Sequence, residues 1–304
     1  MEHFRRGDLT FDVLDRGPQD GTPVVLLHGF PQFNDSWIPV MEQLSAQGYR
    51  CVAPNQRGYS PGARPPRRRD YLAEELVADV VALIDALGVR NVHLVGHDWG
   101  ATVAWATAAL APERLSTVTT LSVPHPAAFF AALATSRQFF ASWYVYFFQL
   151  PRVPEWLLGR KNGKGLTALI EGYAGQTHQA AERDISRLMG SGAFTTALNW
   201  YRAAFRNKPK LINSRIDVPT MHVWSDGDKA LLEKAARNTG KYVDAEYRFE
   251  VVHGATHWMP DQCPDTVADL LLDWFAHHPI DNGEGPRKPL RTKGSGGPTP
   301  VDGG

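Results

Sequence analysis

The stretch Gly96-His97-Asp98-Trp99-Gly100 decides the fold of this chain. It follows the apolar run Val92-His93-Leu94-Val95 and precedes residues 101–107, which read Ala-Thr-Val-Ala-Trp-Ala-Thr. A short apolar run bounded by glycine is typical of a buried strand, and the small residues that follow suit a helix. The pattern predicts a strand, a sharp glycine-flanked turn and a helix, with Asp98 at the turn.

Similar segments continue on both sides of this turn. Helical spacing over 72–87 places Leu76, Val80 and Leu83 on one face, and Gly88 supplies a stop. Strands that alternate with helices imply a mostly parallel sheet with right-handed crossovers, which is an α/β fold. The other expected strands cover residues 9–13, 23–28, 49–53, 115–123, 219–224 and 247–252, and the other expected helices cover residues 36–46 and 266–275.

The alternation stops between residues 124 and 217, where the chain is helix-like and rich in aromatic residues. We therefore expect a helical lid at 124–217, inserted into a core formed by residues 1–123 and 218–278. Residues 279–304 are rich in glycine and proline with few apolar residues, and we expect a disordered tail there.

Composition excludes several classes of protein. The 304 residues are 43% hydrophobic, and 32 basic residues balance 32 acidic ones, so no overall charge favours nucleic acid or an anionic membrane. The short basic run 64–69 is broken by prolines and is interpreted as a solvated loop. Cys51 and Cys263 form no disulfide framework. With neither a signal peptide nor a membrane-spanning run, we expect a cytoplasmic protein.

Reactive residues follow four of the predicted strands. In chain order these segments are His28-Gly29-Phe30-Pro31, the turn at Asp98, Ser225-Asp226-Gly227-Asp228 and His253-Gly254-Ala255-Thr256-His257-Trp258. Functional groups of open α/β sheets gather at the carboxyl ends of the strands. The order of nucleophile, acid and histidine is that of the α/β-hydrolase triad, in which the turn usually carries serine.

Each residue type suits one step of a two-step hydrolysis. The carboxylate of Asp98 is ionised at neutral pH and suits attack on a tetrahedral carbon, which gives an ester. His257 would activate water to hydrolyse that ester, and Asp228 would orient His257. The backbone N–H groups of Phe30 and Trp99 would form the oxyanion hole. The sharp turn would thus expose the side chain of Asp98 to the substrate. Aspartate would replace the usual serine because the first bond to be broken is a carbon–oxygen or carbon–halogen bond at a tetrahedral carbon.

These motifs resemble those of the epoxide hydrolases of the α/β-hydrolase fold, over about residues 7–275. His28-Gly29-Phe30-Pro31 and the Asp98 turn match two family motifs. The lid segments Ser142–Pro151 and Leu198–Arg202 resemble the two that carry the family's tyrosines. The resemblance implies that Tyr144 and Tyr201 hydrogen-bond the epoxide oxygen and protonate it as the ring opens. It also implies an epoxide and water as substrates. The sequence has no metal-binding cluster or phosphate-binding glycine loop, so we expect no cofactor and no metal, and we allow for a homodimer.

Several alternatives stay open from the sequence. Asp226 competes with Asp228 as the acid, His253 with His257 as the base, and Tyr146 with Tyr144. A haloalkane dehalogenase would use the same aspartate, and the fold also serves silent binding modules. An apolar pocket lined by Phe30, Trp99 and lid aromatics favours an aryl or alkyl epoxide. We also predict a cis peptide bond between Phe30 and Pro31.

Overall fold

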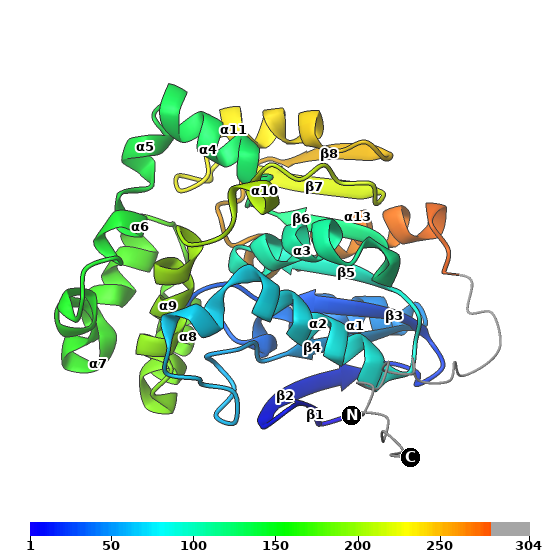
Figure 1. Ribbon diagram of the computed structural model, residues 1–304, viewed down its shortest axis with the longest axis horizontal. Helices are drawn as coiled ribbons and strands as arrows, with labels where there is room; N and C mark the ends of the chain where they lie inside the picture. The colour runs from blue at the N-terminus through cyan, green and yellow to red at the C-terminus, as the bar shows by residue number, and fades with distance from the viewer. Residues whose placement is uncertain (281–304) are drawn as a thin grey trace, which may run out of the picture.

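An eight-stranded sheet forms the centre of the protein (Figure 1). The computed structural model describes residues 1–280, apart from the side chains of 209 and 210, so the predicted tail lies outside the described residues from 281 onward. The strand order is β1-β2-β4-β3-β5-β6-β7-β8. The first two strands pair antiparallel, β2 is also antiparallel to β4, and the remaining strands are parallel. The predicted mostly parallel α/β sheet is confirmed.

The strands and helices have the following bounds. The strands are β1 His3–Arg6, β2 Leu9–Arg16, β3 Thr22–Leu27, β4 Tyr49–Pro54, β5 Val92–His97, β6 Leu115–Leu121, β7 Thr220–Ser225 and β8 Tyr247–Val252. The α-helices are α1 Ile38–Ala46, α2 Ala73–Leu87, α3 Trp99–Leu110, α4 Pro126–Thr135, α5 Gln138–Ala141, α6 Trp143–Phe147, α7 Val153–Gly172, α8 His178–Ser191, α9 Phe194–Ala204, α10 Pro209–Ile212, α11 Glu233–Asn238, α12 Met259–Gln262 and α13 Pro264–His277. Short 3₁₀ helices cover Asn34–Trp37, Arg68–Tyr71, Pro112–Arg114 and Thr239–Tyr242.

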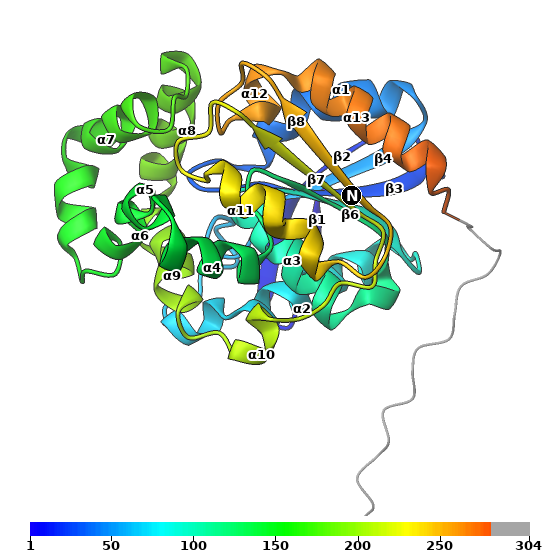
Figure 2. The ribbon, with the colours of Figure 1, turned by 90° about the horizontal axis from the view of Figure 1, so that it is seen from above.

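Helices cover both faces of the sheet, as Figure 2 shows from above. Helices α1 and α13 pack together on one face, where Met41, Leu44 and Leu271 are fully or almost fully buried. Helices α2 and α3 pack on the other face, with Leu83 and Val103 in a second core. The side chains of β3 after Thr22, and all of those of β5, are buried, which explains why both strands read as continuous apolar runs.

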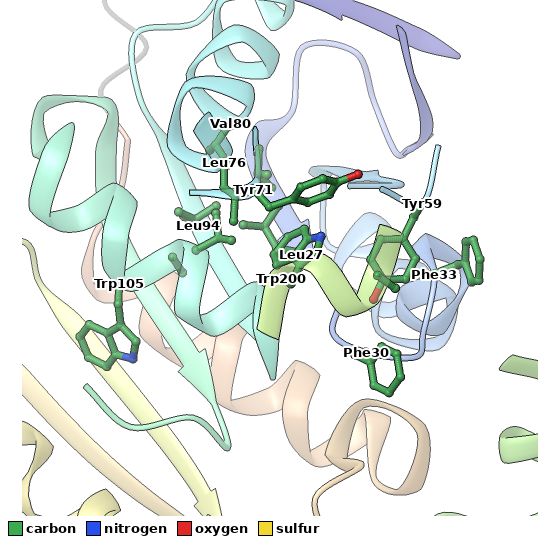
Figure 3. Close-up of a cluster of buried hydrophobic side chains, with 14 of the residues drawn as sticks. Leu27, Phe30, Phe33, Tyr59, Tyr71, Leu76, Val80, Leu94, Trp105 and Trp200 are labelled. Atoms are coloured by element: carbon green, nitrogen blue, oxygen red, sulfur yellow. The ribbon is translucent and has the colours of Figure 1, made fainter. Parts of the chain in front are cut away.

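Along the chain, helices α4 to α10 come between β6 and β7, and Figures 1 and 2 show α6 to α9 on one side of the sheet. We call residues 124–217, which hold these helices, the insertion. Trp200 anchors it to the core: its indole N–H donates to the carbonyl oxygen of Arg57 (2.9 Å). Figure 3 shows Trp200 among buried core side chains that include Leu27, Tyr59 and Tyr71. The hydroxyl of Thr196 adds a second anchor on Gly58 O (2.6 Å).

The sequence analysis missed strand β1. Of its four side chains only Phe4 is buried, stacked on Phe11 of β2, so the strand lacks a clear apolar pattern. The predicted cis peptide bond between Phe30 and Pro31 is confirmed.

Among the helices within residues 1–280, none combines the length and the apolar character that crossing a bilayer requires.

A buried ion pair ties the loop after β4 to helix α2. The guanidinium of Arg57 donates two hydrogen bonds to Asp79, from Nε and Nη2, both at 2.7 Å. Both side chains are almost fully buried, and Arg6 of β1 adds a third bond to Asp79 (2.9 Å). Because Arg57 also presents the carbonyl that holds Trp200, the pair stabilises both the core and the attachment of the insertion.

We predict that Asp79→Asn lowers the free energy of unfolding by about 3 kcal/mol, because the buried Arg57 charge loses its hydrogen-bonded counter-ion and keeps only the exposed carboxylate of Glu75, 3.7 Å away. Asp85→Asn on the same helix is the matched control. Asp85 pairs with Arg114 but is 64% exposed, so its loss should change stability by less than about 1 kcal/mol. Urea denaturation of the three proteins measures both effects, and equal midpoints for the two variants would contradict the assignment.

Candidate active site

The turn after β5 holds Asp98 in a conformation that few residues adopt. Its φ of 52° and ψ of −120° lie outside the ordinary regions for a side chain with a Cβ atom. Gly96 and Gly100, on either side of Asp98, allow the turn to pack closely against the neighbouring backbone. A Cβ atom at Gly96 would lie 2.2 Å from the carbonyl oxygen of Gly100, and one at Gly100 would lie 2.0 Å from that of Leu27. Strand, turn and helix therefore approach too closely for any other residue.

The carboxylate of Asp98 is fixed by contacts on both of its oxygens. Oδ1 accepts a hydrogen bond from the backbone N–H of Phe30 (2.8 Å), and Oδ2 lies 3.4 Å from Nε2 of His257. Among the hydrogen bonds of residues 1–280, none runs from the Trp99 N–H to this carboxylate. Burial disfavours the charged form, but the hydrogen bond and charge of His257 prevail and lower the pKa of Asp98. The group is thus an ionised carboxylate in a buried site.

Asp228 holds the other side of the His257 ring. Nδ1 of His257 lies 2.8 Å from Oδ2 of Asp228, and both side chains are buried. Oδ1 of Asp228 accepts hydrogen bonds from the N–H groups of Ala230 (2.8 Å) and Leu231 (2.9 Å), which fix the carboxylate. Burial disfavours the imidazolium, yet the two flanking carboxylates outweigh it and raise the pKa of His257 to about 10.

The rival pair, Asp226 and His253, lies at the surface. Nδ1 of His253 is 2.7 Å from Oδ2 of Asp226, and their side chains are 80% and 42% exposed. Asp226 also accepts from the N–H of Gly254 (2.9 Å), so it caps the loop. The geometry brings Asp228 and His257, and not Asp226 and His253, to Asp98.

Tyr144 and Tyr201 approach the carboxylate from the insertion. Their rings lie 6.2 Å apart between centroids, and both side chains line two cavities that also reach Asp98. Burial, followed by the charge of Asp98, raises the pKa of both phenols well above its usual value, so both remain protonated. Tyr146, the rival of Tyr144, is 38% exposed and stacks on Phe205.

The two cavities meet at Asp98, Tyr144 and Tyr201. The larger chamber extends along α3 past Trp99 and is bordered by side chains of α4. The smaller chamber is lined by Phe30 and His257 among others. Apart from Asp98 and His257, the lining residues are uncharged at neutral pH; the other histidine, His125, has a pKa lowered to about 4, chiefly by burial.

Sequence reasoning missed the groups that position His257. Its carbonyl oxygen accepts from Oγ of Ser122 (3.0 Å) and lies 2.8 Å from Nε2 of His97. Nδ1 of His97 is in turn 3.2 Å from Oε1 of Gln32. Ser122 directly follows β6, at the same sheet edge as Asp98, and its φ of 69° marks another tight turn. Its place after a strand was the only available signal. His28 has a structural role, because its Nε2 accepts a hydrogen bond from the Gln56 N–H (3.1 Å).

The assembled groups suit nucleophilic chemistry. A buried carboxylate has a histidine–aspartate pair beside it and two neutral phenols across the cavity. Such a set can supply a nucleophile, a base and two proton donors. Within residues 1–280, no cluster of three or more His, Cys, Asp or Glu side chains is placed to hold a metal ion.

Comparison with protein families agrees with this geometry. The family model described as the alpha/beta hydrolase fold matches residues 22–262, which span most of the chain and every strand from β3 to β8. The chain belongs to the α/β-hydrolase fold family.

Relatives of this α/β hydrolase include proteins named as epoxide hydrolases. Epoxide hydrolase 3 of Xenopus tropicalis is 32% identical over 276 residues, which cover 88% of this chain and 75% of that protein. An AB hydrolase superfamily protein of Bacillus subtilis is 32% identical over 88% of this chain and 94% of its own length. The crystal structure of epoxide hydrolase A from Mycobacterium thermoresistibile has a TM-score of 0.78 and 26% identity, covering 92% and 98% of the two chains. The predicted resemblance to this group is confirmed.

The raised pKa of His257 predicts a pH dependence of stability. The folded-state pKa of about 10 exceeds the unfolded value of about 6.5. The imidazolium therefore stabilises the fold fully below about pH 6.5, and this contribution is lost as the pH rises through about 10. We expect the stability advantage of the wild type over His257→Gln to shrink between pH 7 and 10 in urea denaturation.

The control for this measurement is His253→Gln, which removes the exposed histidine of the Asp226 pair. Because solvent screens that pair, its stability should follow the wild type at each pH. A His257→Gln curve that runs parallel to the wild type over the whole range would contradict a histidine charged by its two carboxylates.

Proposed function

We propose that this protein is an epoxide hydrolase that converts apolar aryl or alkyl epoxides to vicinal diols through a covalent ester on Asp98. One observation carries the proposal: Asp98 faces two protonated tyrosines across a cavity and has a histidine–aspartate pair behind it. Relatives named as epoxide hydrolases, at about 30% identity, support it.

In the first step, Oδ2 of Asp98 attacks one carbon of the epoxide. A carbon–oxygen ester bond forms, the bond between that carbon and the ring oxygen breaks, and the electron pair stays on the oxygen. Tyr144 or Tyr201 donates its proton to this oxygen, which becomes the first hydroxyl of the diol. The hydrogen bond from Phe30 to Oδ1 leaves Oδ2 as the attacking atom.

In the second step, His257 removes a proton from water, and the hydroxide attacks the carboxyl carbon of the ester. The N–H of Phe30, joined by that of Trp99, stabilises the negative charge that forms on the carbonyl oxygen. Collapse breaks the bond between the carboxyl carbon and the alkyl oxygen, which takes up a proton as the second hydroxyl. Asp98 is regenerated as a carboxylate.

The charge on Asp98 would determine at which step His257 is protonated and at which step it can act as a base. At rest, two carboxylates raise the pKa of His257, which favours its protonated form. Ester formation neutralises Asp98, so one of the two charges that raise this pKa disappears. His257 can then release its proton, by way of the tyrosines and water, and act as a base at the stage that requires one. Asp228 remains to stabilise the imidazolium that forms again.

The two chambers support the substrate class. Apart from the reacting groups, their walls are uncharged and mostly apolar, so a charged substituent would be left without a counter-ion. The larger chamber has room for the bulkier substituent, between Trp99 and Phe129. We infer that the smaller chamber holds the other substituent and the water near His257. On this proposal the insertion, which contributes both tyrosines, acts as a lid over the site.

A panel of epoxides and haloalkanes tests the reaction class. Formation of diol from styrene-oxide-like compounds, with little halide released from haloalkanes, is the expected result. Rapid halide release without diol would favour a dehalogenase, and a protein that bound these compounds without turnover would be a silent binding module.

We predict that His257→Gln forms the ester but does not hydrolyse it efficiently. Asp98 remains able to attack, while the base for the second step is missing. Mass spectrometry after mixing with a reactive epoxide should show a gain of one epoxide mass on the peptide that contains Asp98. The double variant Asp98→Asn, His257→Gln should show no gain. Full steady-state turnover by His257→Gln would refute the assignment of the base.

We predict that Tyr144→Phe combined with Tyr201→Phe loses most diol formation, by about 10²–10⁴-fold. Both proton donors disappear while the ring volumes stay, so the fold should be retained. Each single variant should lose less, because either phenol partly replaces the other. Tyr146→Phe is the matched control and should keep wild-type turnover. Unchanged epoxide turnover in the double variant would show that both tyrosines only line the pocket and do not donate protons.

A further inference from the structure

Large apolar side chains are exposed on one part of the protein. Of the ten that are exposed among the described residues, all but Leu110 belong to the insertion. Phe140 is 75% exposed and Trp156 is 63% exposed, which is unusual for side chains of this size. The others are Phe139, Trp143, Tyr146, Leu150, Val153, Leu157 and Phe205. Exposed apolar side chains that gather on one part of a surface mark an interaction site.

Ring contacts join several of these side chains into one patch. Phe139 lies 5.5 Å from Phe140 and 5.4 Å from Tyr146 between ring centroids, and Tyr146 stacks on Phe205 at 6.3 Å. The remaining members belong to α6, the start of α7 and the link between them. Both views show α6 and α7 on the side of the molecule away from the sheet, and Figure 1 shows α5 on the same side (Figures 1 and 2). We call these nine side chains the insertion patch.

The same segment carries a local positive charge. Five basic residues lie between positions 137 and 164, against one acidic residue, Glu155. Glu155 is already paired with Arg202 through two hydrogen bonds (2.7 and 2.9 Å). The guanidinium of Arg160 lies over the ring of Trp156 at 4.8 Å, so charge and apolar surface are intermixed. The basic residues, all exposed, are Arg137, Arg152, Arg160, Lys161 and Lys164.

We propose that the insertion patch docks on an anionic lipid surface. Exposed Trp, Phe and Leu side chains enter the headgroup region, while Lys and Arg attract anionic lipids. The charge selects this occupant over a second copy of the chain. A two-fold contact would use the same patch on both protomers and would bring the two basic clusters together. The balanced charge of the whole chain does not oppose lipid binding, because screening makes local charge decisive.

The patch continues into the substrate cavity. Phe205 belongs to the patch and also lines the larger chamber, as Val145 of α6 does. Docking would therefore place an entrance of that chamber against the lipid. This consequence, unlike the docking itself, rests on the proposed function: an apolar epoxide dissolves in lipid and would reach Asp98 without crossing water.

Flotation of the full chain with vesicles tests the docking. Vesicles of phosphatidylcholine alone are compared with vesicles of equal parts phosphatidylcholine and phosphatidylglycerol. We expect binding to the anionic vesicles that weakens with added salt. Phe140→Ser with Trp156→Ser, and separately Arg160→Glu with Lys164→Glu, should each reduce binding about tenfold or more.

Matched controls lie outside the patch. Leu110→Ser removes the exposed apolar side chain of α3, and Arg5→Glu with Arg16→Glu reverses the same number of exposed charges on β1 and β2. Both controls should bind as the wild type does, and circular dichroism shows that every variant is folded.

Three results would overturn the proposal. These are no flotation of the wild type, equal binding by the patch variants, or a solution dimer that Phe140→Ser with Trp156→Ser converts to monomer. The last would identify a second copy as the occupant. Vesicle binding is measured without any epoxide turnover. The test of docking therefore gives a result even if the protein hydrolyses no epoxide, and failure of one proposal can be distinguished from failure of the other.

Discussion

The close approach of the turn at Asp98 to strand β3 is the constraint on which the site depends. Without a Cβ atom at Gly100, the first turn of α3 can lie against the carbonyl of Leu27. That contact brings the segment after β3 beside the carboxylate, so that the Phe30 N–H reaches Oδ1. Nucleophile and oxyanion donor are therefore positioned by backbone packing, which sets their separation more rigidly than side-chain rotamers would.

Charge in the site is balanced by groups from distant parts of the chain. One histidine lies between two carboxylates, and all three side chains are buried. In a medium of low polarity, the attraction between opposite charges offsets part of the cost of burying them. The arrangement requires β5, β7 and β8 to be in register, because each strand ends next to one member. Ser122 and His97 then fix the carbonyl of His257 from the sheet edge.

Much of this could be predicted from the sequence. Strands β3 and β5 are buried on both faces, so their patterns are unambiguous, and the glycines around Asp98 identify the turn. Strand β1 could not be found, because only Phe4 contacts the core. The choice of Asp228 over Asp226, and of Tyr144 over Tyr146, depends on which side chain points inward after a loop or along a short helix. Neighbouring positions of equal chemistry cannot be separated by pattern alone.

The insertion begins and ends at two neighbouring strands of the sheet, β6 and β7. The chain leaves the sheet after Leu121 and rejoins it at Thr220, in a strand that pairs directly with the one it left. The entropy of closing such an excursion grows only slowly with its length. The length and sequence of the segment that carries the two phenols and the outer apolar face can therefore change during evolution while the carboxylates and the histidine of the site stay in place.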